Sequence, residues 1–219
     1  QAVKFGVKRI IFISTLKVHG EKSDNSNPIS YKNRIVPETN YSKSKHEAEE
    51  VIKKISSNTN LEHVIIRSPV VYGPGTRGNF SRLMSLVKSG IPIPLGSVKN
   101  TRSFISIDNL IDFLILCITK SEAANQTFLV SDDQDLSTTE LIKKIASMME
   151  KKTNLLNVPI PLLKLVGYIF RKSNDVDRLI NSLEVDISHT CQILNWRPPF
   201  NIDRELKKMT DNFIEKSFK

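Results

Sequence analysis

The sequence has little cysteine and no long hydrophobic run. Its two cysteines, Cys117 and Cys191, lie far apart without Cys-x-x-Cys spacing, which excludes a disulfide framework and a zinc site. The four histidines also lack the spacing of metal ligands. The longest apolar run, residues 113–118, is much shorter than the roughly 18 residues of a membrane span. We therefore expect a protein of the reducing cytoplasm, with no metal site and no membrane among its partners.

The charge is strongly positive, with 32 Lys and Arg against 23 Asp and Glu and a net charge of +9. The paired lysines at 143–144, 151–152 and 207–208 fall on polar faces of predicted helices rather than in one block. A solvated surface is therefore the main interpretation, and an anionic small ligand is the alternative. We expect no nucleic acid partner.

Strands alternate with helices along much of the chain. Short β-rich apolar runs without alternation predict buried strands at 9–14, 63–67 and 127–130. Helices are predicted around 41–55, 80–89, 109–120, 137–149 and 202–213, and the helix at 109–120 is apolar almost all round and so expected to be buried. This pattern predicts an α/β fold: part of a Rossmann-like doubly wound parallel sheet, with a smaller, mostly helical lobe.

The first of these helices has a clear apolar spacing. Ala48, Val51, Ile52 and Ile55 fall at i, i+3, i+4 and i+7 and predict its inner face. Two Glu–Lys pairs at i,i+4, which begin at positions 49 and 50, are expected to support the outer face.

One glycine-rich loop imitates a dinucleotide-binding motif. Gly73, Gly75 and Gly78 fit G-x-G-x-x-G between a strand and a helix. However, Pro74 removes an N–H that a pyrophosphate cradle would use, and no strand ending in an acidic residue follows about 20 residues later. We interpret this segment as a tight structural or substrate-side loop.

A tyrosine and a lysine are better candidates for chemistry. Tyr41 and Lys45 lie one turn apart on a predicted helix and so share a face. A phenol is a poor base near neutral pH, and a neighbouring ammonium favours its phenolate form, which suits proton transfer coupled to hydride transfer. Taken alone, the pair is equally explained as a helix start with a surface lysine.

Two hydroxyls precede this pair at the end of a predicted strand. Ser14 and Thr15 lie at the carboxyl end of the 9–14 strand, where doubly wound sheets bind their ligands. Either could hydrogen-bond a substrate hydroxyl that Tyr41 deprotonates.

Several motifs occur together in order: FIST at 12–15, VHG at 18–20, YSKSK at 41–45, RSPVVYGPG at 67–75 and RSFISIDNL at 102–110. In these motifs the chain resembles the extended short-chain dehydrogenase/reductases, in particular the nucleotide-sugar epimerase/dehydratase branch and its UDP-glucose 4-epimerase-like enzymes of surface-polysaccharide synthesis. The likeness covers residues 1–120 and resumes at 182–199.

The resemblance implies a role for each residue of the motifs. Tyr41 would be the catalytic acid/base, Lys45 would hold the nicotinamide ribose and promote ionisation of Tyr41, and Thr15 would be the catalytic hydroxyl. Ser14 and the backbone near Pro69 would line the cofactor, which is NAD, with NADP not excluded.

The resemblance also implies two residues on the substrate side. Asn79 and Arg102 would contact the diphosphate of a nucleotide sugar, since a guanidinium suits phosphate oxygens. The alternatives are an N-cap for Asn79 and a surface ion pair for Arg102. Trp196 is expected in the core.

The chain departs from the family pattern in three places. Leu16 and Lys17 stand where sugar dehydratases have an Asp-Glu pair, which disfavours dehydration, and Val70 stands where galactose epimerases have Asn. The N-terminal glycine fingerprint is absent, so we expect the sequence to start about halfway through the Rossmann sheet and to bind NAD weakly by itself.

The resulting prediction is NAD-dependent epimerisation at C4 of a UDP-hexose or UDP-N-acetylhexosamine, by an enzyme that can form a homodimer. Two alternatives stay open: an NAD(P)H-dependent 4-keto-sugar reductase, and a non-catalytic redox-sensing or scaffold relative. We expect residues 1–75 and 103–135 to bind the cofactor, and residues 76–102 and 136–219 to form the substrate-binding lobe.

Overall fold

The fold is built around a small parallel sheet. The computed structural model describes residues 1–23 and 27–216. In the described part, strands β1 (Arg9–Thr15), β2 (Glu62–Ser68) and β5 (Gln126–Leu129) pair in parallel in the order β1-β2-β5. The register of β1 on β2 brings Ser14 opposite Arg67 and Thr15 opposite Ser68. The predicted α/β class and the three predicted strands are confirmed.

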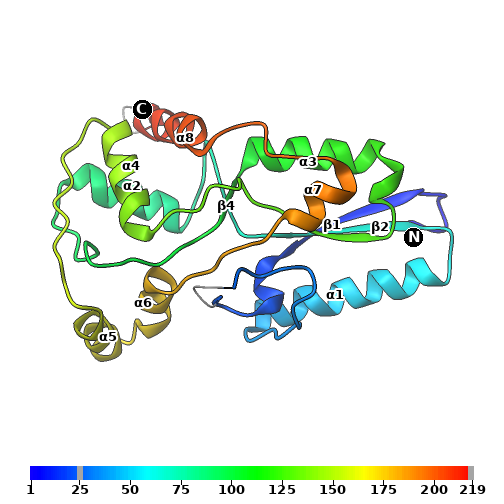
Figure 1. Cartoon of the computed structure of the whole chain (residues 1–219), viewed down its shortest axis with the longest axis horizontal. Coiled ribbons are helices and arrows are strands. Elements are labelled where there is room, and N and C mark those ends of the chain that lie inside the picture. The colour runs from blue at the N-terminus through cyan, green and yellow to red at the C-terminus, as the bar shows by residue number, and fades with distance from the viewer. Residues whose placement is uncertain (24–26, 217–219) are drawn as a thin grey trace.

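Helices cover both faces of this sheet. Helix α1 (Asn40–Ser57) lies along one face, and α3 (Ile107–Thr119) lies along the other (Figure 1). Helix α7 (Ser188–Leu194) packs beside β5 on the side of α3. The buried side chains between these elements include Ile66, Phe113, Phe128 and Trp196. Chain segments from both ends of the sequence therefore share the core of the sheet.

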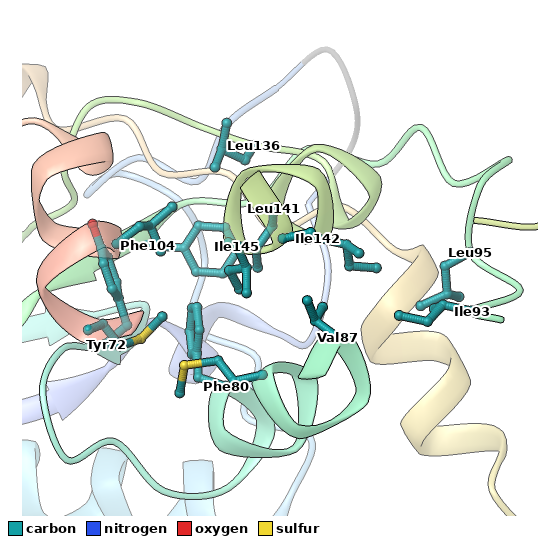
Figure 2. Packing of buried hydrophobic residues seen from close by; sticks show 14 of the residues in the cluster. Tyr72, Phe80, Val87, Ile93, Leu95, Phe104, Leu136, Leu141, Ile142 and Ile145 are labelled. Carbon is teal, nitrogen blue, oxygen red and sulfur yellow. The ribbon is translucent and has the colours of Figure 1, made fainter. Parts of the chain in front are cut away.

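The second region is a mostly helical lobe. A second parallel pair, β3 (Val70–Tyr72) and β4 (Phe104–Ser106), leads into it. Its helices are α2 (Asn79–Ser89), α4 (Thr138–Met148), α5 (Ile160–Ile169), α6 (Ser173–Ile180) and α8 (Ile202–Lys216). Figure 2 shows its apolar core, in which Phe80, Phe104 and Ile145 meet from α2, β4 and α4.

Two short 3-10 helices, η1 (Leu16–His19) and η2 (Ser121–Ala123), complete the elements of the described residues. Local sequence explains several boundaries. Gly90 adopts a left-handed conformation and ends α2, and Ser137 with Glu140 forms the predicted capping box of α4. Of the helices in residues 1–23 and 27–216, none has the length and apolar character that a membrane crossing requires.

The predicted inner face of α1 is wrong in part. Val51 and Ile55 are exposed, whereas Glu49 is fully buried. The inner face instead follows Ser42, Lys45, Glu49 and Ile52. The cause is tertiary, because Arg67 on β2 gives the carboxylate of Glu49 a buried partner. Glu49 therefore does not pair with Lys53 on the outer face.

The expectation that the 109–120 helix is buried all round is also wrong. Leu110, Phe113 and Cys117 face the core, and burial raises the pKa of the Cys117 thiol to about 12. Ile111, Ile115 and Ile118 are exposed on the opposite side. The apolar composition of α3 does not reveal which side meets the sheet, because both sides are apolar.

Candidate active site

A cavity of about 420 Å³ opens at the carboxyl ends of β1 and β2. This volume is in the range of small-molecule sites. Five of the seven predicted site residues line it: Ser14, Thr15, Tyr41, Lys45 and Pro69. The other lining residues are Ile13, Leu16, Lys17, Ser68, Val70, Val71 and Leu183. The tertiary structure thus brings together residues from four separate parts of the chain: 13–17, 41–45, 68–71 and Leu183.

The end of β1 presents two buried hydroxyls. The Thr15 hydroxyl accepts a hydrogen bond from the Lys17 N–H at 3.3 Å and caps the 3-10 helix η1, which fixes its position. The Ser14 hydroxyl is buried and has no hydrogen-bond partner within residues 1–23 and 27–216. Because buried polar groups normally have partners, a free hydroxyl in the cavity wall fits a polar ligand.

The start of α1 positions the tyrosine. Thr39 and Ser42 form a reciprocal capping box, so Tyr41 lies in the first helical turn, more than half exposed. Lys45 follows one turn later on the same side, as predicted. Its ammonium donates to the Ile13 carbonyl oxygen at 2.9 Å and lies 4.7 Å from the centre of the Phe12 ring.

A buried polar network lies one turn further along α1. The Arg67 guanidinium donates to both carboxylate oxygens of Glu49, at distances of 2.6–3.2 Å. It also donates to Nε2 of His19 at 3.0 Å. His19 is therefore the neutral tautomer that donates from Nδ1 to the Arg34 carbonyl at 3.3 Å. Burial, and then the positive charge of Arg67, lower the pKa of His19.

The sequence patterns did not predict this network. It joins α1, β2 and the end of η1. Cavity residues lie on α1, at the end of β2 and at the start of η1. An indication was present, because Arg67 ends a predicted buried strand and a buried arginine needs a carboxylate partner. The sequence does not show which of several glutamates on α1 would supply it.

The glycine-rich loop is held by its own contacts. A Cβ on Gly73 would lie 2.5 Å from Ile107 Cγ2, so glycine is required for this close approach. The Gly75 N–H donates to the Asn212 side chain of α8 at 3.0 Å. These contacts agree with the interpretation as a structural loop.

Asn79 and Arg102 do not line the cavity. Asn79 is the exposed first residue of α2, and the N-cap is Gly78, so the N-cap interpretation is wrong. Arg102 donates from one terminal nitrogen to the Arg178 and Asn181 carbonyls at 2.9 and 3.0 Å. Desolvation lowers the pKa of its guanidinium, and the side chain is half-buried. Arg102 therefore holds the end of α6 by hydrogen bonds to carbonyls and does not form a surface ion pair within the described residues. The assignment of both residues to a diphosphate stays a prediction.

Trp196 lies in the core, as predicted. Its indole N–H donates to Asp112 at 2.8 Å, and its ring packs edge-on against Phe113. Within the ranges that the structure describes, no group of three His, Cys, Asp or Glu side chains could hold a metal ion.

Comparisons with known proteins agree on one family. Residues 1–131 match the NAD dependent epimerase/dehydratase family. A UDP-glucose 4-epimerase of Vibrio cholerae is 45% identical over 216 residues, which cover 98% of this chain and 66% of that protein. An N-acetyl-α-D-glucosaminyl-diphospho-ditrans,octacis-undecaprenol 4-epimerase of Escherichia coli O157:H7 is 30% identical over 172 residues, 76% of this chain and 50% of that protein.

Solved structures show the same fold. A UDP-glucuronic acid 4-epimerase from Bacillus cereus, in complex with NAD, superposes with a TM-score of 0.76 at 21% identity, and the match covers 98% of this chain and 64% of that one. A UDP-glucose 4-epimerase from Thermotoga maritima superposes with a TM-score of 0.74 at 19% identity, over 100% and 67% of the two chains. The chain thus spans between half and two thirds of the length of these relatives.

Proposed function

Because the chain belongs to the NAD dependent epimerase/dehydratase family, we propose that its protein epimerises C4 of a nucleotide-activated sugar, with Tyr41 as the acid/base. The single observation that carries the proposal is the cavity that gathers Thr15, Tyr41 and Lys45 at the ends of β1 and β2. The family supplies the reaction type, and the cavity supplies the residues.

The chain's own groups have distinct tasks in this reaction. Tyr41 takes the proton of the C4 hydroxyl, and Thr15, which the Lys17 N–H fixes in place, hydrogen-bonds the same hydroxyl and orients it. Bound NAD would accept the C4 hydride and, after the ketone has rotated, would return it to the opposite face of C4. Tyr41 returns its proton to the C4 oxygen, and the product is the C4 epimer.

Three residues of the cavity wall would hold the cofactor. The Ser14 hydroxyl, which has no hydrogen-bond partner among the described residues, is available to a polar group of the ligand, and the backbone at Pro69 lies at the exit of β2. Lys45 would exchange its bond to the Ile13 carbonyl for the ribose hydroxyls. NAD is the cofactor we propose, because solved structures of the same fold are complexes with NAD.

The composition of the cavity favours epimerisation over elimination of water. No Asp or Glu is among its described lining residues. Leu16 is fully buried, and Lys17 pairs with Glu21 at 2.5 Å, so the positions after Thr15 offer no acid and base for dehydration. This supports an epimerase or a reductase, and the epimerase agrees with the names of the Vibrio cholerae and Escherichia coli relatives.

The substrate we propose is a UDP-hexose or UDP-N-acetylhexosamine, consumed in surface-polysaccharide synthesis. Asn79 and Arg102 would contact its diphosphate from the lobe. We also propose a cytoplasmic location and a homodimer. We propose that residues 1–75 and 103–135 bind the cofactor and that residues 76–102 and 136–219 bind the substrate, although α7 (Ser188–Leu194), within the latter range, packs on the sheet.

The test is to incubate the protein with NAD and UDP-glucose or UDP-N-acetylglucosamine and to follow C4 configuration by NMR and absorbance at 340 nm. We expect both epimers to form with no net change in absorbance. Stoichiometric consumption of NADPH with a 4-keto sugar, and no epimer, would establish the reductase instead. Absence of both reactions in a protein that binds NAD and UDP-sugar would favour a non-catalytic role.

A further inference from the structure

Helix α5 exposes an unusual amount of apolar surface at the far end of the lobe (Figure 1). Leu162, Leu165, Val166 and Ile169 fall at i, i+3, i+4 and i+7 and form one stripe along the helix. Their side chains are between 45% and 63% exposed. Tyr168 and Phe170, at the end of the helix, are 76% and 70% exposed. We call these six residues the α5 patch.

The opposite side of α5 holds the helix in place. Leu163 is buried in the lobe core, and Gly167 packs against α6, where a Cβ would lie 2.7 Å from Val176 Cγ2. The turn after α5 is closed by a 2.7 Å hydrogen bond from the Lys172 N–H to the Gly167 carbonyl. The fold therefore fixes the inner side of the helix and leaves the α5 patch facing outward.

The charge around the α5 patch is positive in excess. Residues 160–172 contain Lys164, Arg171 and Lys172 and no acidic residue, and all three cations are exposed. The adjoining helix α6 contributes Asp175, Asp177 and Arg178, and the Lys172 ammonium lies 3.8 Å from the Asp175 carboxylate. A hollow of about 260 Å³ at the turn is lined by Tyr168, Arg171, Ser173 and Asn174. A cationic rim beside exposed aromatic and aliphatic side chains is complementary to a surface with an apolar interior and anionic groups above it.

We infer that the α5 patch docks on an anionic lipid bilayer surface. At 1.5 Å per residue, ten residues give a helix of about 15 Å, half the thickness of a bilayer core, so α5 lies in the interface rather than crossing it. The stripe and the two aromatic side chains enter the headgroup boundary, and Arg171 meets lipid phosphates. The net charge of +9 adds a general attraction to such a surface.

This inference revises the expectation that no membrane is among the partners. That expectation came from the length of apolar runs, which excludes spanning and says nothing of a short helix that lies on the surface. The docking does not depend on the proposed reaction, because the patch and the cavity are made of different residues.

The test is sedimentation of the protein with vesicles of equal parts phosphatidylcholine and phosphatidylglycerol, and with pure phosphatidylcholine. We expect binding to the mixed vesicles that weakens as salt is raised, and little binding to pure phosphatidylcholine. The Leu165→Glu/Ile169→Glu variant should lower the partition coefficient at least about tenfold. The matched control is Ile111→Glu/Ile115→Glu, an equally spaced exposed pair on α3, which should bind like the wild type.

A fluorescence measurement tests the same contact by a change in signal instead of a loss of binding. Phe170→Trp adds an exposed indole, whereas Trp196 is buried, so brominated lipids should quench the new fluorescence and leave the wild-type signal almost unchanged. The inference is overturned if mixed vesicles do not bind, if the α3 control loses binding equally, or if the added fluorescence of the Phe170→Trp variant is not quenched. A lipid-free dimer that the α5 variant dissociates, without vesicle binding, would instead identify the patch as a contact between copies.

Discussion

Two glutamates in different regions of the molecule are both fully buried, yet their surroundings differ. Glu49 on α1 receives three hydrogen bonds from Arg67, which also contacts His19. Glu205 on α8, in the lobe, has neither carboxylate oxygen hydrogen-bonded within the described residues, and Arg204 lies beside it at 3.5 Å. Burial raises the pKa of Glu205, and Asp108 adds to this effect.

The difference shows that a buried carboxylate links parts of the fold only where a cation is buried beside it. Around the sheet, the network of Glu49, Arg67 and His19 ties α1 to the strand ends that form the cavity. In the lobe, α2, α4 and α8 meet mainly through apolar side chains. The ionised carboxylate of Glu205 therefore destabilises the folded state and does not connect these helices. Substitutions in the two regions can test this contrast.

The largest expected effect is on activity at the start of α1. Tyr41→Phe keeps the ring but removes the group that transfers the proton, so turnover in the proposed reaction should fall by roughly 10²–10⁴-fold. The free energy of unfolding should not change, because Tyr41 is largely exposed. Steady-state kinetics and urea denaturation measure the two quantities. Lys43→Met, on the outer side of the helix, is the control, and equal damage there would contradict the shared-face argument.

Removing the cation of the network should have the largest effect on stability. Arg67→Met leaves Glu49 buried without a partner, and loss of one member of a buried pair typically costs about 3–5 kcal/mol. Urea denaturation should show this loss. Glu49→Gln/Arg67→Met should recover much of it, since no uncompensated charge remains. A double variant no better than Arg67→Met would mean that the network acts through packing alone.

The lobe should respond to loss of apolar volume instead. Ile145→Ala removes a fully buried side chain from the core shown in Figure 2, and such truncations cost about 2–5 kcal/mol. This loss should be nearly the same at acidic and at neutral pH, because no titratable group is involved. If thermal denaturation showed that the loss of stability in Ile145→Ala varies strongly with pH, the contrast between the two regions would be refuted.

A smaller effect on the free energy of unfolding should come from His19, in the sheet region, at pH values below neutral. Since the folded-state pKa of His19 is lowered, the unfolded chain takes up a proton as pH falls through about 6.5 while the folded state does not. Stability should therefore fall with decreasing pH, by at most about 1.4 kcal/mol per pH unit for one proton. His19→Gln should reduce this slope, and an unchanged slope would refute the assignment.

The smallest effect should come from Glu205 and should have the opposite sign. Since its folded-state pKa is raised, its favourable form is the neutral one, and stability is lost as pH rises from about 4.5. Glu205→Gln should raise the free energy of unfolding at neutral pH by up to about 1 kcal/mol and leave it almost unchanged below about pH 4. Glu49→Gln, in contrast, should destabilise at neutral pH. If Glu205→Gln and Glu49→Gln both destabilised the protein at neutral pH, the proposed difference between the two buried glutamates would be wrong.

Much of the cavity could be predicted from motifs, because strand ends and helical turns place residues by local rules. Ser14 and Thr15 lie at a strand end, and Tyr41 and Lys45 lie one turn apart, whatever else the chain does. Arg102 could not be placed in this way. Its partners are carbonyls of Arg178 and Asn181, and no local pattern indicates that these distant segments meet.

By itself, the sequence determined where the three strands and several helix caps lie and which local segments carry Ser14, Thr15, Tyr41 and Lys45, since short-range sterics and hydrogen bonding govern these features. Only the tertiary structure decided which face of a helix is buried. Glu49 faces inward because Arg67 neutralises it, and Leu165 and Ile169 face outward because Leu163 and Gly167 already make the contacts of α5. Which helix residues become buried depends on the side chains that pack against the helix, and these side chains come from distant parts of the sequence.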